Sequence, residues 1–264
     1  MQVFYLPRGK VALGVVILLL FLAGFFALLG EYMPAVWPVF SSQERLVPIY
    51  AVATDEKKVS ISFDAAWGAE YTPQLLEILD RYKVKTTFFL VKFWVEKYPD
   101  VTKQIVAAGH ELGNHSATHP HMNALSEEEI YRELEDTNNL LERLTGQRPK
   151  LFRPPFGEYN NTLIRVAEEL GMKTIQWSVD SLDWRDLSAA EITTRVLEQI
   201  EPGAIVLFHN NAQHTPAALG PILEQLQADG YKIVPISQLI LWDNYYISPH
   251  TGIQHPKSPA GGNE

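Results

Sequence analysis

The feature that most constrains the fold of this chain is an alternation, between residues 59 and 236, of short apolar runs with longer segments of helical spacing. Periods of two and of about 3.6 residues predict strands and helices respectively. The predicted strands span residues 59–63, 85–91, 111–114, 151–153, 174–179, 204–208 and 232–236. The predicted helices span residues 72–82, 99–108, 126–144, 160–170, 189–200 and 215–228. This alternation predicts an α/β fold with a parallel sheet and outer helices, either doubly wound or closed into a barrel.

Polar patches at the ends of the predicted strands distinguish between these two forms. Five of the seven strands are followed by such a patch, and the patches contain Asp64, His115, Arg153, Asp183 and His209. In a (β/α) barrel the loops after the strands meet at one face, so residues distant in sequence act on one substrate. Because so many strands end in a patch, we favour a single (β/α) barrel of about seven parallel strands.

Composition excludes several classes of function. The chain has 264 residues, 46% of them hydrophobic, which suits one large domain. Its formal net charge of -9 and the lack of a long basic run argue against nucleic acid as a partner. There is no cysteine, so a disulfide framework, a thiolate metal site and a cysteine nucleophile are excluded. Any bound metal therefore needs histidine and carboxylate ligands. The oligomeric state is left open.

The N-terminal region predicts a membrane anchor. Residues 11–30 form an apolar run without charge that is long enough to span a bilayer. Arg8 and Lys10 precede it, so the positive-inside rule places residues 1–10 in the cytoplasm and the catalytic region outside it. A cleavable secretory signal needs a shorter apolar core and an A-x-A site, and residues 28–34 offer no good site. We therefore expect an uncleaved transmembrane signal-anchor that crosses the cell membrane once.

Two segments outside the alternating region lack its periodicity. Residues 31–57 are expected to form a juxtamembrane linker that leads to a catalytic domain over residues 58–242. Residues 243–264 are expected to form a disordered C-terminal tail, because prolines and glycines interrupt the stretch and no apolar periodicity is present. His250 and His255 lie in this tail and are interpreted as solvated residues.

His115 and His119 are candidate metal ligands. Neutral imidazole is a common zinc ligand, and two histidines four positions apart can present two nitrogens to one ion. The following Pro120 disfavours a long helix, so we expect the pair on a loop or a single turn. In a chain with eight histidines, the alternative is a pair of surface or core residues. His110 is interpreted as a strand-edge residue, and His121 as a loop residue or one that supports the candidate ligands.

Asp64 is a candidate general base. It follows a predicted strand and would lie at the mouth of the barrel, where a carboxylate can take a proton from water. Arg153 offers a bidentate partner that holds a carboxylate in its ionised form. The alternatives are a helix-capping or loop aspartate and a surface arginine.

His209 is a candidate general acid because it closes an apolar strand that should be buried. Asp183 can hold this imidazole and raise its pKa, so that it donates a proton to a leaving group. Trp184, Trp67 and Leu207 are candidate apolar walls of the site, although core packing explains any one of them equally well.

The five patches, in this order, resemble those of the polysaccharide deacetylases with a NodB-homology domain, carbohydrate esterase family four. The resemblance covers roughly residues 58–241. It implies a distorted, TIM-like (β/α) barrel that removes N-acetyl groups from polymers of N-acetylglucosamine. It also implies a divalent metal, most simply zinc, that holds the water and the acetyl carbonyl.

The same resemblance implies roles for individual residues at the metal and the base. The family motif Thr-Phe-Asp-Asp-Gly aligns with residues 62–66, so Asp64 matches the base and the metal-binding aspartate falls on Ala65. His115 and His119 match the two metal histidines. Arg153 matches the arginine that orients the base. The third family ligand is therefore absent, and the metal affinity should be lower.

The resemblance further implies how the substrate is held. Phe156 stands where the family usually has tyrosine, and its backbone N–H would stabilise the oxyanion. Asp183 and Trp184 match the pair that tunes the acid and lines the acetate pocket. Leu207 and His209 match the pocket leucine and the general acid.

Three functions remain open on the sequence. The leading one is a metal-assisted deacetylase of an acetylated glycan, with peptidoglycan as its expected partner. The variant at residues 64–68, with the single anchor, looks most like the sporulation-associated, PdaB-type branch, which suggests the spore cortex. The rival is a catalytically silent glycan-binding protein that has lost a ligand at Ala65. The third is a glycosidase that uses Asp64 and Asp183 as paired carboxylates.

Overall fold

The computed structural model describes residues 16–28 and 44–257, and the chain divides into the units Met1–Arg45 and Leu46–Glu264. In the first unit, residues 16–28 form a helix. The predicted span at residues 11–30 lies partly outside the described residues. Within the described ranges, no helix has the combined length and hydropathy that a bilayer crossing requires.

The second unit is built on one parallel sheet. Its strand order is β6-β5-β4-β3-β2-β8-β7, and β9 pairs with the start of β2. The strands are β2 (Lys58–Ala65), β3 (Thr87–Leu90), β4 (Glu111–Asn114), β5 (Leu151–Phe152), β6 (Lys173–Thr174), β7 (Val179–Asp180), β8 (Ile205–His209) and β9 (Lys232–Ile233). Each pair within this sheet is parallel, which confirms the α/β alternation.

The strand predicted at residues 174–179 is divided in two, and this opens the barrel. Its first part, β6, pairs with β5 at one end of the strand order, and its second part, β7, pairs with β8 at the other. Between them, the Gln176 N–H donates to the carbonyl of Ile49 at 2.8 Å instead of continuing either ladder. The expected closed barrel is therefore a distorted half-barrel, whose two edges are joined by one chain segment.

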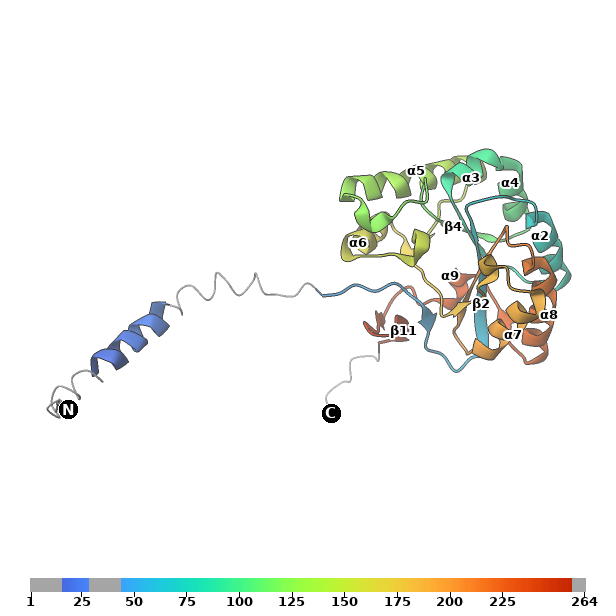
Figure 1. Ribbon diagram of the computed structural model, residues 1–264. Coiled ribbons are helices and arrows are strands. Elements are labelled where there is room, and N and C mark those ends of the chain that lie inside the picture. Colours follow the sequence, from blue (N-terminus) through green and yellow to red (C-terminus); the bar gives the residue numbers. More distant parts are fainter. Residues whose placement is uncertain (1–15, 29–43, 258–264) are drawn as a thin grey trace, which may run out of the picture. The chain divides into compact units, whose positions relative to one another are not determined.

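Most of the helices lie around the outside of the sheet, and the short one at Ile236–Leu239 packs on its inner side (Figure 1). They are α2 (Thr72–Arg81), α3 (Lys92–Lys97), α4 (Pro99–Ala107), α5 (Glu127–Thr145), α6 (Asn161–Glu169), α7 (Ala189–Gln199), α8 (Thr215–Ala228) and α9 (Ile236–Leu239). Six of these match predicted helices, whereas the short α3 and α9 were not predicted. Capping boxes start α5 and α7, where Ser126 pairs with Glu129 and Ser188 with Glu191. These side chains satisfy backbone groups that have no partner inside the helix.

The centre of the sheet sets which way the strand-end residues face. Phe63 is fully buried and stacks on Phe88 and Phe208 of the neighbouring strands, with ring centroids 4.9 and 5.7 Å away. Successive side chains of a strand point to opposite faces. Phe63 and Ala65 belong to the apolar core under the helices, while Asp64 between them faces the inside of the half-barrel.

The structure corrects the boundaries of the linker and of the C-terminal tail. A second sheet pairs β1 (Ala51–Val52) with β11 (Ile253–Pro256), and β11 with β10 (Tyr245–Ile247). The side-chain amide of Gln254 is fully buried and exchanges two hydrogen bonds with the backbone of Leu241, at 2.7 and 2.6 Å. These long-range bonds order a segment that has no periodicity of its own. Residues 258–264 of the predicted tail lie outside the described residues.

Candidate active site

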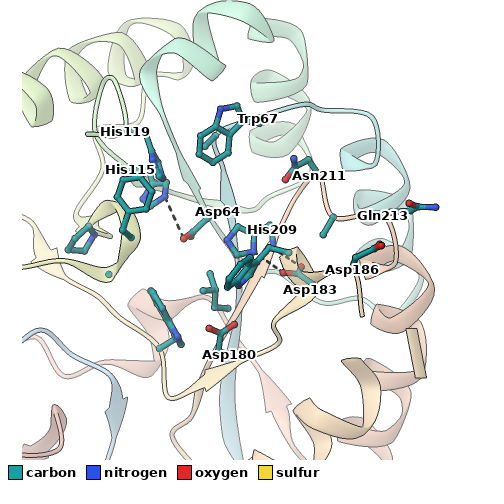
Figure 2. A pocket seen from close by; sticks show the side chains of 18 residues that line it. Asp64, Trp67, His115, His119, Asp180, Asp183, Asp186, His209, Asn211 and Gln213 are labelled. Carbon is teal, nitrogen blue, oxygen red and sulfur yellow. Dashed lines mark hydrogen bonds and ion pairs between the residues drawn. The ribbon is translucent and has the colours of Figure 1, made fainter. Parts of the chain in front are cut away.

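A cavity of about 690 Å³ opens at the carboxyl ends of the strands (Figure 2). It brings together residues that the sequence analysis selected from separate loops. Those that line it are Asp64, Trp67, His115, His119, Phe156, Asp183, Trp184, Leu207 and His209. Arg153 lies beneath the floor with no exposed surface, and Ala65 is absent from the lining.

Asp64 is held from two sides. Its Oδ1 accepts a hydrogen bond of 2.8 Å from Nη1 of Arg153, and its Oδ2 lies 3.6 Å from Nε2 of His115. All three side chains are buried, with exposed fractions of 7% or less. Burial acts to raise the pKa of Asp64, but the charge and hydrogen bond of Arg153, together with the neighbouring imidazoles, outweigh it and hold that pKa below its usual range. Asp64 is thus an ionised carboxylate inside the cavity.

Arg153 is fixed by neighbours that the sequence patterns did not reveal. Its guanidinium lies 4.2 Å from the ring centre of Phe89, and its Nη2 donates to the carbonyl of Gln176 at 3.1 Å. Phe89 is paired in register with Gly113 on β4, and a Cβ at Gly113 would meet the phenyl ring. Only glycine at this position leaves room for the ring that supports the arginine.

His115 and His119 lie on the loop after β4, as predicted, and both are neutral. Nδ1 of His115 is 2.7 Å from the carbonyl of Arg153, which turns Nε2 toward Asp64. Burial lowers the pKa of His115, and burial together with His115 lowers the pKa of His119 to about 4. The two rings are 5.0 Å apart, centre to centre. Such neutral imidazoles are suited to metal ligation.

The donor set is nevertheless incomplete for the implied metal. Among the residues that the structure describes, no three or more His, Cys, Asp or Glu side chains are arranged to hold an ion. The methyl group of Ala65 is fully buried in the core, and the next residue, Ala66, lines the cavity instead. Asp64, the nearest carboxylate, is already bonded to Arg153. The residues present therefore do not fit a complete metal centre of His and carboxylate ligands.

Asp183 and His209 form the opposite side of the cavity. Asp183 is almost fully buried, and its Oδ1 lies 2.8 Å from Nδ1 of His209. Its Oδ2 accepts the backbone N–H of His209 at 2.8 Å and the hydroxyl of Thr215 at 2.6 Å. Burial acts to lower the pKa of His209, but the hydrogen bond and charge of Asp183 raise it above its usual value. The imidazole is thereby held in an orientation suited to proton donation.

Exposed aromatic rings form the rim. Trp67, Phe156 and Trp184 are each more than half exposed although they are large and apolar. The ring of Phe156 packs edge-on against His119 at 4.6 Å and stacks on His121 at 4.4 Å. Flat exposed rings of this kind can bind the apolar faces of sugar rings. His121, predicted to be a loop residue, supports the rim through Phe156 but does not line the cavity.

Several contributing residues were missed by the sequence analysis. Thr215 supports Asp183, and Asp180, Asp186 and Trp177 line the cavity. Asp180 had a signal, since it opens the polar patch that contains Asp183. The role of Thr215 had none, because it starts α8 and reaches Asp183 only through the packing of that helix on the sheet.

Comparison with known proteins agrees with this geometry. Residues 51–175 match the model of the polysaccharide deacetylase family. A peptidoglycan-N-acetylglucosamine deacetylase of Bacillus cereus is 34% identical over 207 residues, which are 77% of this chain and 75% of that protein. The chain belongs to the polysaccharide deacetylase family. This membership indicates a hydrolase that acts on amide carbon–nitrogen bonds. Deacetylases of this family are generally metal-dependent.

Two further relatives qualify the comparison. An uncharacterised protein of Bacillus subtilis, YlxY, is 37% identical over 193 residues, which are 73% of this chain and 60% of that protein. The crystal structure of a CE4 family pseudoenzyme from Bacillus anthracis is 38% identical, with a TM-score of 0.72 over 79% of this chain and 72% of that one. The family therefore includes an inactive protein that is similar to this one.

Proposed function

We propose that the chain is a polysaccharide deacetylase that hydrolyses N-acetyl groups of a glycan containing N-acetylglucosamine, with peptidoglycan as its substrate. One observation carries the proposal. Asp64 on β2 and His209 on β8 are partners in register on adjacent parallel strands. Neighbouring strands are about 4.8 Å apart, so a base and an acid stand side by side on one face of the cavity. The deacetylase relatives of this chain support the substrate class.

In the proposed reaction, Asp64 takes a proton from a water molecule as that water attacks the acetyl carbonyl carbon. The carbonyl oxygen becomes an oxyanion, and the backbone N–H of Phe156 is the donor that the family resemblance assigns to it. His209 then donates its proton to the amide nitrogen as the carbon–nitrogen bond breaks. The products are acetate and the free amino sugar. Arg153 keeps Asp64 ionised, and Asp183 keeps His209 oriented and protonated.

Acetate release from purified muropeptides tests this proposal. We expect release by the wild-type chain and a loss of at least about a hundredfold in Asp64→Asn, because an amide cannot accept the proton. Asp100→Asn is a matched control, since Asp100 is an exposed aspartate on α4. Full turnover in Asp64→Asn would exclude this mechanism.

Zinc is a separate part of the proposal. The described residues do not complete a metal centre, so the steps above are derived from protein groups alone. Acetate release should therefore be measured with a chelator and with added Zn²⁺. Turnover that appears only with Zn²⁺ would show that a water or a further side chain completes the shell.

The second candidate is a catalytically silent glycan-binding protein. Two observations favour it, namely the burial of Ala65 in the core and the similarity to a pseudoenzyme. It predicts glycan binding without acetate release under any divalent metal. Turnover that His209→Ala abolishes would rule it out.

The glycosidase reading is disfavoured by the contacts of Asp183. Both of its oxygens are occupied, by His209 and by Thr215, so it is not free to act as a second catalytic carboxylate. Glycosidase activity would be supported only if the chain released new reducing ends from the glycan.

We also propose that residues 11–30 anchor the chain in the cell membrane with the deacetylase domain outside the cytoplasm. The support is the uncharged apolar run and the basic residues Arg8 and Lys10 before it. The proposed setting is the cell wall, including the spore cortex. Protease added to intact protoplasts should remove the domain, whereas full protection would contradict this orientation.

A further inference from the structure

The two sides of the cavity differ in charge. His115 and His119 form one side, and Asp180, Asp183 and Asp186 lie on the other, near His209 (Figure 2). Among the described residues that line the cavity there is no lysine and no arginine. Apart from Asp64, which is paired with Arg153, the carboxylates that line the cavity are all on the second side. The second side carries the excess negative charge.

Asp180 and Asp186 are not used by the proposed reaction. Asp180 ends β7, and its Oδ1 accepts the backbone N–H of Leu182 at 2.9 Å, which fixes the side chain. Asp186 follows a short turn at residues 183–185 and is exposed, and its Oδ1 lies 3.6 Å from Nε2 of His214. One aspartate is therefore inside the cavity and the other at its mouth.

The cations nearest to these carboxylates do not neutralise the wall. Arg153 is beneath the floor and is paired with Asp64. Arg195 donates to the backbone carbonyl of Asp180 at 2.7 Å but does not line the cavity. The guanidinium of Arg185 lies 5.7 Å from the ring of Trp184 and does not line it either. The ring of His209 is bonded to Asp183.

We infer that Asp180 and Asp186 act as a charge filter that favours glycans with free amino groups beside the acetylated sugar and disfavours sugars that carry a carboxylate. The inference rests on the proposed function, because it names the substrate class of that cavity. An ammonium group on a flanking sugar meets the acidic wall, whereas a muramic acid whose carboxylate carries no stem peptide meets like charge. Strands that are already partly deacetylated then become the better substrates.

Binding measurements with the full chain test the filter without relying on turnover. Three tetrasaccharides serve as probes: the fully acetylated tetramer of N-acetylglucosamine, the same tetramer with both terminal units deacetylated, and one with free muramic acid carboxylates. By calorimetry at low salt, we expect the amino-bearing probe to bind about fivefold more tightly than the neutral one, and the carboxylate probe to bind most weakly. Because salt screens exposed charges, about 0.5 M NaCl should reduce these differences.

Variants assign the effect to the two aspartates. Asp180→Asn with Asp186→Asn should bring the three affinities close together, while Asp100→Asn on α4 should preserve the order. Equal affinities in the wild-type chain, a reversed order, or no binding of any probe would overturn the inference. If the order holds but no acetate is released, the inference stands and the proposed deacetylase activity fails.

Discussion

Asp183 accepts two hydrogen bonds of 2.8 Å from His209, one from the ring nitrogen Nδ1 and one from the backbone N–H. The two bonds use different carboxylate oxygens, so they fix both the position of the strand end and the rotation of the ring. Nε2 is left as the nitrogen that can exchange a proton with a substrate. This arrangement makes the Asp183 charge the main adjustable influence on the candidate acid.

Asp183→Asn should shift the pH profile. Burial alone would lower the pKa of His209, and the hydrogen bond and charge of Asp183 raise it above 6.5. An acid is active while protonated, so wild-type activity falls as the pH rises through the raised pKa. As the pH rises, the activity of the variant should begin to fall at a lower pH than that of the wild type. Its rate at neutral pH should fall by about a hundredfold or more. Acetate release measured across pH checks this.

Thr215→Val is the matched control for that prediction. It removes one hydrogen bond to Asp183 but keeps the carboxylate charge. The pH at which its acetate release falls should therefore remain nearer to that of the wild type. If acetate release falls at the same pH in the two variants, the charge of Asp183 is not what sets the pKa of His209. The His209 proton also contributes stability, which is present below about 6.5 and is lost as the pH rises through the folded pKa.

Arg153→Met should destabilise the fold. It leaves the buried Asp64 without its partner, and breaking a buried pair costs about 3–5 kcal/mol. Urea unfolding at neutral pH measures this. The pKa of Asp64 is lowered in the folded chain, so the stabilisation is present above about 3.8 and is lost as the pH falls through the folded pKa. The difference in unfolding free energy between the variant and the wild type should therefore become smaller as the pH is lowered.

Arg132→Met controls for the loss of an arginine. Arg132 forms an exposed ion pair with Glu128 on α5, and such pairs contribute about 0–1 kcal/mol. We expect almost no change in its unfolding free energy. Equal losses of unfolding free energy in the two variants would show that the buried pair of Arg153 and Asp64 stabilises the fold no more than an exposed pair does.

Ala65→Asp should couple folding to metal. Ala65 is fully buried in the core, so a carboxylate there should cost about 2–4 kcal/mol in a metal-free chain. The family resemblance places a metal ligand at this position. If the new carboxylate turns toward His115 and His119, added Zn²⁺ recovers the loss because it binds only the folded state. Thermal unfolding with and without Zn²⁺ checks both parts.

Ala66→Asp is the comparison for that experiment. Ala66 is also buried but lines the cavity, so a carboxylate there can turn toward the opening and the metal-free chain should lose less stability than Ala65→Asp. A metal-free Ala65→Asp chain as stable as the wild type would contradict the assignment of Ala65 to the core.

Gly113→Ala should impair Arg153 indirectly. A Cβ at Gly113 would meet the ring of Phe89, on which the guanidinium packs. Overpacking of this kind costs about 1–3 kcal/mol, and we expect lower acetate release as Arg153 moves from Asp64. In the control Gly220→Ala on α8, the nearest atom of another element is Oη of Tyr82, 3.8 Å from the new Cβ, so we expect a much smaller change. Equal stability of the two variants would contradict the argument.

The sequence by itself determined the strands and helices that lead to the site. Period-two and period-3.6 patterns, capping boxes and the polar residues at strand ends are local signals, and Asp64, His115, Arg153 and His209 were found from them. The meeting of these residues at one face of the sheet also followed, because parallel strands in a (β/α) fold end at the same face.

Only the tertiary structure decided the features that depend on distant partners. Residues 174–179 divide into β6 and β7 because each half pairs with a different edge of the sheet, and β11 forms because β1 and β10 supply its hydrogen bonds. The direction of Ala65 into the core depends on the register of β2 with its neighbours. Backbone bonds and side-chain faces are set by register and packing between remote segments, which no local pattern in the chain encodes.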